Sequence, residues 1–103
     1  MDFETYKEWT RTTAVYPKEI EEEYLLLGLA NEVGELLGKK KKELRGDGDK
    51  YTDKLDELGD VFWYLARLVD HYGQTHQDVL HRNFLKLTDR KKRGVIKGDG
   101  DNR

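Results

Sequence analysis

The chain has 103 residues, of which 39% are charged and 36% are hydrophobic, and its formal net charge is −2. This length suits one small domain, and the near balance of 19 basic and 21 acidic residues gives no general case for binding nucleic acid or an anionic membrane. Cysteine is absent, which excludes disulfides and thiol chemistry, and no apolar run approaches the roughly 18 residues of a membrane span, so we expect a cytoplasmic protein.

The N-terminal segment predicts a first helix from Phe3 to about Thr13, which Asp2 can cap. Aromatic residues recur in it at three-residue steps: Phe3, Tyr6 and Trp9. We expect this aromatic row to pack in the core, and its alternative role is a wall for a nucleobase. The helix should end before Pro17, because proline disfavours helical geometry in the residue that precedes it.

A long second helix should begin between residues 19 and 23 and end in the lysine run 39–42, since acidic residues suit a helix N-terminus and basic residues suit its C-terminus. The stretch from Tyr24 to Ala30 is apolar at nearly every position, which indicates a helix covered on more than one side, and association with a second copy would cover it. Glu32 and Glu35 stand three residues apart in this helix. Gly28, one turn earlier, would let another group approach closely.

The third helix should run from about Asp53 to Tyr72 and contains a second pair of acidic residues, Glu57 and Asp60, at the same spacing. Residues three apart lie on one face of a helix, so pairing the second and third helices would collect four carboxylates into one cluster. Such a cluster resists burial unless a cation lies within it, and hard divalent cations prefer oxygen ligands. A plain solvated face remains an equally weighted interpretation of these residues.

A fourth helix should begin after Thr75, which can cap it, and end at Arg93 before Gly94. We expect its core stripe to comprise Leu80, Phe84 and Leu87. An adjacent polar stripe comprises Asn83, Lys86 and Arg90. Residues 94–103 form a glycine-rich segment that we expect to be irregular, and the whole chain, 1–103, is predicted to be one domain.

Several segments resemble the MazG-like all-α nucleoside triphosphate pyrophosphohydrolases, in order along the whole chain. They are the pairs Glu32-x-x-Glu35 and Glu57-x-x-Asp60, the second within DELGDVFWYLA, together with TAVYP, NFLKLTDRKKRG and the ending GDGDNR. The resemblance implies an all-α bundle of four to five helices, assembled as a homodimer or homotetramer. It also implies cleavage of a nucleoside triphosphate between its α and β phosphates, giving a monophosphate and pyrophosphate.

The same resemblance implies site residues. Mg²⁺, with Mn²⁺ as a substitute, would be held by Glu32, Glu35, Glu57 and Asp60. The nucleotide would be contacted by Asn83, Lys86 and Arg90. Among the carboxylates, Glu57 is expected to be essential and Glu35 is the candidate for the general base. On charge grounds, Arg103 is a further candidate for neutralising the leaving pyrophosphate.

Two alternatives stay open at the level of sequence. The first is an enzyme of the same kind that is restricted to one substrate, such as dUTP, dCTP or phosphoribosyl-ATP, because no motif decides base specificity. The second is a non-catalytic, oligomeric helical interaction module whose carboxylates are solvated charge. Nucleic-acid binding by the basic run 90–93 is weaker than either, since four cations also suit a helix C-terminus.

Overall fold

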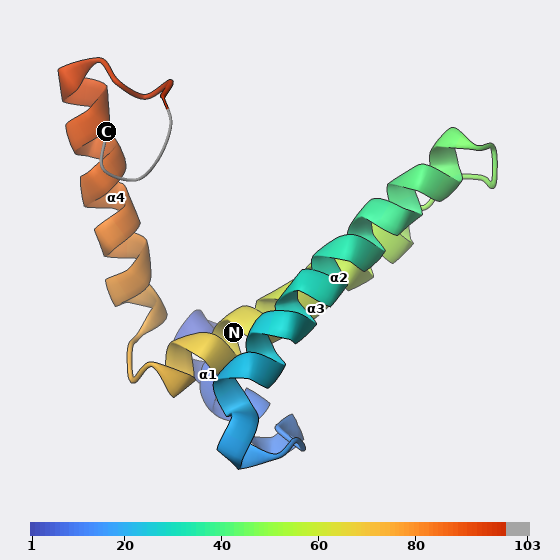
Figure 1. Cartoon of the computed structure of the whole chain (residues 1–103), viewed down its shortest axis with the longest axis horizontal. Coiled ribbons are helices and arrows are strands. Elements are labelled where there is room, and N and C mark those ends of the chain that lie inside the picture. Colours follow the sequence, from blue (N-terminus) through green and yellow to red (C-terminus); the bar gives the residue numbers. More distant parts are fainter. Residues whose placement is uncertain (99–103) are drawn as a thin grey trace.

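The computed structural model describes residues 1–98, and this part of the chain is all-helical with no strand. Its elements, with two 3₁₀ turns at Arg11–Thr13 and Lys18–Ile20, are α1 (Phe3–Thr10), α2 (Glu21–Leu44), α3 (Tyr51–His71) and α4 (His76–Arg93). Helices α2 and α3 form a long antiparallel hairpin, α1 packs near its open end, and α4 leaves that end at a wide angle (Figure 1). None of these helices is both long enough and apolar enough to cross a membrane.

The predicted helix boundaries that rest on capping residues are confirmed. Asp2 accepts a hydrogen bond from the Thr5 N–H at 2.8 Å and begins α1. Thr75 accepts one from the Asp78 N–H at 3.0 Å and begins α4. Gly94 ends α4 with a φ of 71°, a left-handed conformation that glycine adopts without a steric cost.

The first α-helix is shorter than predicted, because α1 ends at Thr10 and a 3₁₀ turn covers residues 11–13. Three threonine hydroxyls in this region donate to the backbone carbonyls three residues earlier: Thr10 to Lys7, Thr12 to Trp9 and Thr13 to Thr10. Such local bonds compete with regular helical hydrogen bonding. The threonine-rich sequence therefore tightens the end of the helix.

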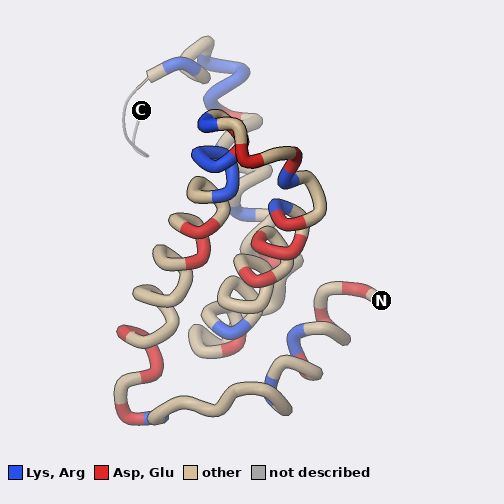
Figure 2. The backbone as a smooth tube through the Cα atoms, turned by 90° about the vertical axis from the view of Figure 1, so that its right-hand side faces the viewer, with Lys and Arg blue, Asp and Glu red and all other residues tan. Residues whose placement is uncertain are grey.

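The turn between α2 and α3 is shorter than the sequence indicated, since α2 continues to Leu44 and α3 already begins at Tyr51. Glu43 organises this turn by accepting hydrogen bonds from the Lys50 N–H at 2.8 Å and from Lys54 Nζ at 2.9 Å. Those two bonds, with Lys54 first, lower the pKa of Glu43 to about 2. Figure 2 shows the lysines of α2 gathered at this end of the hairpin, and acidic residues both in the middle of α2 and at its opposite end.

Helices α2 and α3 are tightly packed at Gly28, where a Cβ atom would overlap the ring of Tyr64. Gly28 therefore admits an aromatic side chain against the α2 backbone, one turn before Glu32, as the sequence predicted. The buried apolar side chains in the described part of the chain are few: Leu25, Ala66 and Leu68.

The prediction that α4 contributes a core stripe is not met within one chain. Leu80, Phe84 and Leu87 are all exposed, Phe84 at 62%. The physical reason is that α4 diverges from the hairpin (Figure 1), so within residues 1–98 no helix runs alongside most of its length. In this part of the chain, side-by-side helix packing is made mainly by α1, α2 and α3.

A partly buried ion-pair network that the sequence did not reveal connects the N-terminal segment to the C-terminal end of α3. Asp70 accepts hydrogen bonds from Arg11 at 2.8 and 3.0 Å and from the buried Arg67 at 2.8 Å. The hydrogen bonds from Arg11 first, and then those from Arg67, hold the pKa of Asp70 well below its ordinary value. This network fixes the position of the turn at residues 11–13 against α3.

Candidate functional site

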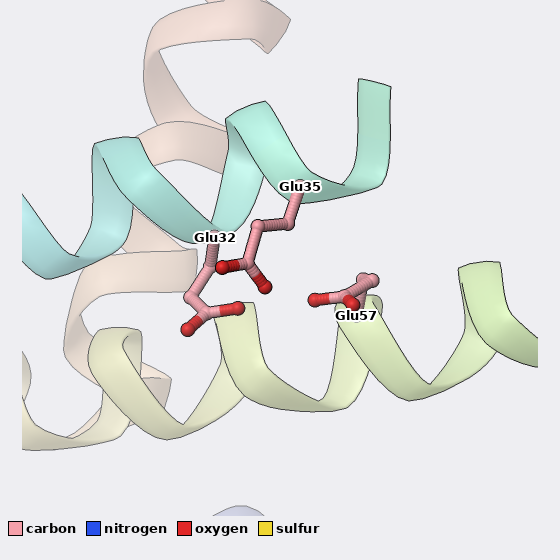
Figure 3. Close-up of side chains that lie close together, drawn as sticks. All are labelled: Glu32, Glu35 and Glu57. Carbon is pink, nitrogen blue, oxygen red and sulfur yellow. The ribbon is translucent and has the colours of Figure 1, made fainter. Parts of the chain in front are cut away.

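Three carboxylates converge between the two long helices. Glu32 and Glu35 on α2 point toward Glu57 on α3 (Figure 3), and each offers an oxygen within 4.8 Å of the oxygens of the other two. The i, i+3 spacing places the first two on one face of α2, and the antiparallel pairing of the hairpin places Glu57 opposite them. The sequence predicted this pairing of helices.

The electrostatics of this cluster indicate a place for a cation. Burial raises the pKa of Glu32 to about 7, and the neighbouring carboxyl groups of Glu35 and Glu57 add to the effect. Glu32 Oε2 and Glu57 Oε2 are both buried without a hydrogen-bond partner among the described residues. A buried carboxylate oxygen without a partner is costly, and a divalent cation with oxygen ligands would satisfy both atoms. This set of carboxylate oxygen ligands therefore fits Mg²⁺ or Mn²⁺.

Asp60, the fourth carboxylate of the prediction, lies beside this cluster rather than within the group of three. It also raises the pKa of Glu32 through its charge, so it is close enough to act on the same site. Asp60 and Glu32 line a pocket of about 310 Å³ together with Thr13, Trp63 and Tyr64. Two of the carboxylates thus line the same pocket as two aromatic side chains.

Two polar neighbours of the cluster were not predicted from the sequence. Lys39, one turn after Glu35 on α2, has its Nζ atom 3.9 Å from Glu57 Oε1. Asn31 donates a hydrogen bond of 3.3 Å to Glu35 Oε1. Both could have been found from i, i+4 spacing to Glu35, but lysine and asparagine on a helix surface are too common for that spacing alone to single them out.

The predicted nucleotide-contacting residues on α4 lie apart from the carboxylates. Asn83 and Lys86 line a different pocket, of about 740 Å³, that also includes Gln74 and Arg82. Arg90 is buried, and Arg103 lies outside the described residues. Because α4 diverges from the hairpin (Figure 1), one chain by itself does not bring this polar stripe to the carboxylate cluster.

Aromatic residues around Asp60 complete the surroundings of the site. The Trp63 indole N–H donates a hydrogen bond of 2.8 Å to Thr13 Oγ1. Burial raises the pKa of Tyr6, and the charge of Asp60 contributes to the same effect. The position of Trp63 one turn after Asp60 was visible in the sequence. Its contact with Thr13, fifty residues away along the chain, had no local signal.

Comparison with known proteins agrees with the helical hairpin and its acidic pairs. The profile of the MazG nucleotide pyrophosphohydrolase domain matches residues 20–95. The chain is also similar to the Gene 37 protein of Mycobacterium phage L5, with 41% identity over 114 aligned positions that cover 100% of both chains. No solved structure matches the chain.

Proposed function

The chain belongs to the MazG nucleotide pyrophosphohydrolase family, and on that premise we propose that it hydrolyses a ribo- or deoxynucleoside triphosphate between the α and β phosphates. The products are the nucleoside monophosphate and pyrophosphate. One observation supports this proposal above the others: three carboxylates converge from two helices, and two of them hold buried oxygens without a partner. A solvated acidic face would leave those oxygens in water.

We propose that Glu32, Glu35, Glu57 and Asp60 hold Mg²⁺, for which Mn²⁺ can substitute. A bound divalent cation would lower the pKa of a water molecule and neutralise the charge that develops on phosphoryl oxygens. The carboxylates themselves keep the polyphosphate from binding without a cation, because like charges repel.

The general base in this proposal is Glu35. It is the exposed member of the three converging carboxylates, so it can reach a water molecule that approaches from solvent. Its Oε1 atom accepts the amide hydrogen bond of Asn31, which leaves Oε2 to take a proton. Lys39, beside Glu57, places a positive charge at the edge of the same site.

Cleavage next to the α phosphorus is favoured by the polar stripe of α4. Lys86 and Arg90 are one helical turn apart, a spacing suited to holding a pyrophosphate leaving group, and Asn83 lies a turn earlier, toward the sugar. These residues do not meet the carboxylates among the described residues of one chain, and Arg90 is buried. The proposal therefore requires that α4 of a second copy or a movement of α4 brings them there and exposes Arg90 to the ligand.

The test is a panel of ribo- and deoxynucleoside triphosphates incubated with Mg²⁺ in ¹⁸O-labelled water. We expect label in the nucleoside monophosphate, none in the pyrophosphate and no diphosphate. Nucleoside diphosphate and orthophosphate as primary products would contradict the assignment of Lys86 and Arg90. No turnover of any triphosphate, with no thermal stabilisation by Mg²⁺, would instead favour a non-catalytic interaction module.

A further inference from the structure

The pocket beside the carboxylates is lined by two chemically different kinds of side chain. Glu32 and Asp60 are acidic, and Trp63 and Tyr64 are aromatic. Its volume of about 310 Å³ lies at the lower limit for small-molecule sites, so it suits one part of a ligand rather than a whole nucleotide. With a divalent cation held by the carboxylates, a ligand that matches this lining carries both a phosphate group and a flat, uncharged ring.

Trp63 is partly exposed, but a hydrogen bond and two aromatic contacts fix the orientation of its indole ring. Its indole N–H is bonded to Thr13 Oγ1 at 2.8 Å, and the Thr13 hydroxyl in turn donates to the Thr10 carbonyl at 3.1 Å. The rings of Tyr16 and Tyr64 contact the indole at interplanar angles of 88° and 80°. Both contacts are edge-on, and within residues 1–98 no aromatic ring stacks parallel to the indole of Trp63.

From this arrangement we infer that Trp63 is the stacking platform for the nucleobase of the substrate and that Thr13 is the residue that positions it. The inference rests on the proposed function and extends it to recognition of the base. Aromatic side chains bind bases through their faces, and this stacking tolerates different bases because every base has a flat π surface.

The spacing of Asp60 and Trp63 along α3 is consistent with the proposed cleavage between the α and β phosphates. Trp63 follows Asp60 by three residues, so the two lie on one face of the helix and about one turn, roughly 5 Å, apart. In a nucleotide, the phosphate attached to the sugar is the one nearest the base. A base on Trp63 therefore places the α phosphate, rather than the γ phosphate, next to the carboxylates.

The experiment compares a nucleoside triphosphate substrate with inorganic tripolyphosphate, a competitor that has no base. In Trp63→Ala we expect the KM for the nucleotide to rise roughly 5- to 150-fold, the range that loss of one base–aromatic stack produces. The inhibition constant of tripolyphosphate should not change, which also shows that the variant is folded. Trp63→Phe keeps a flat ring and should retain most of the affinity. Trp9→Ala is the matched control, because Trp9 is half exposed and does not line the pocket.

Thr13 is tested by a pair of variants. Thr13→Val removes the hydrogen-bond acceptor of the indole and should raise KM with little effect on kcat, and Thr13→Ser should restore the wild-type value. An unchanged nucleotide KM in Trp63→Ala would overturn the inference. An equal weakening of nucleotide and tripolyphosphate would also overturn it, since Trp63 would then only support the carboxylates.

A fluorescence measurement separates failure of this inference from failure of the proposed reaction. In a Trp9→Phe variant Trp63 is the single tryptophan, so stacking of a base should quench its emission. We expect quenching by a nucleoside triphosphate with Mg²⁺ and none by tripolyphosphate, whether or not the triphosphate is hydrolysed. If none of the nucleotides in the panel quenches the emission, Trp63 is not the stacking platform, even if the enzyme hydrolyses those nucleotides.

Discussion

At the scale of single residues, Glu57 links the carboxylates of α2 to α3 and is close to Lys39. Replacing it by glutamine keeps the shape but removes the charge and one oxygen ligand. We expect Glu57→Gln to abolish pyrophosphate release while far-UV circular dichroism shows unchanged helix content. Asp56→Asn, which neutralises the exposed neighbouring carboxylate outside the cluster, is the control and should remain active. Full activity of Glu57→Gln would remove Glu57 from the proposed metal site.

Asp70 gives a prediction for pH that is independent of the metal site. Because hydrogen bonds from Arg11 and Arg67 lower its pKa from the ordinary 3.8, the folded protein binds fewer protons there than the unfolded chain does. The stabilisation is therefore fully present above pH 3.8 and is lost as the pH falls through the lower, folded-state pKa. Asp70→Asn leaves the buried Arg67 without its carboxylate, so we expect it to cost roughly 1.5–3 kcal/mol at neutral pH.

The measurement for Asp70 is the free energy of unfolding by urea at several pH values from neutral to below pH 3.8. The difference between the wild type and Asp70→Asn should shrink in the most acidic samples. A difference that stays constant over the whole range would show that the pKa of Asp70 is not lowered by folding. Asp56→Asn again serves as the control, with no comparable loss.

At the scale of elements, the ring of Tyr64 on α3 lies against the backbone of α2 at Gly28. A methyl group at Gly28 would overlap the Tyr64 ring and push the helices apart one turn from Glu32. We expect Gly28→Ala to destabilise the protein by about 1–3 kcal/mol, as overpacking does, and to weaken Mg²⁺ binding. Both are measured by thermal unfolding with and without Mg²⁺.

Gly34→Ala provides the matched control on the same helix. A Cβ at Gly34 meets nothing within 4 Å, so only the higher helix propensity of alanine should act. This gain is about 0.5–1 kcal/mol. Equal effects of the two substitutions would show that the contact with Tyr64 does not set the spacing of the hairpin.

The parts of the elements that could be predicted from sequence depend on residues near one another along the chain. Asp2, Thr75 and Gly94 cap helices through bonds that span a few residues, so their signals are local. The acidic pairs were found for the same reason, since i, i+3 spacing defines a helix face whatever the tertiary structure. That the two acidic pairs lie close together required the further assumption that the second and third helices pack side by side.

The parts that could not be predicted depend on contacts between distant segments. Asp70 meets Arg11 across 59 residues and Trp63 meets Thr13 across 50, and no periodicity in the sequence reports either pair. The direction of α4 was also missed. An apolar stripe such as the one containing Phe84 indicates that a helix face must be covered, but not which helix or which chain covers it.

At the scale of the whole molecule, apolar side chains remain exposed on both long arms of the structure. On α2 they include Leu26 and Leu27, the latter 72% exposed, and on α4 they include Phe84. Exposed apolar faces on α2 and α4 favour association with a second copy of the chain. This would give the homodimer or homotetramer that the sequence led us to expect. Light scattering at micromolar concentration should therefore give at least a dimer.

Assembly should also control activity, because the carboxylates and the polar stripe of α4 do not meet within one chain (Figure 1). We expect Leu27→Glu to dissociate the oligomer, since a charge on the shared face opposes association, and to lower activity. The loss of folding stability in the single chain should be small, because Leu27 is exposed there.

Val15→Glu is the control, an equally drastic change at a loop residue that is 89% exposed. Size and activity are compared over a dilution series. A wild-type monomer with undiminished activity would show that one chain is sufficient and that α4 must fold back onto its own hairpin.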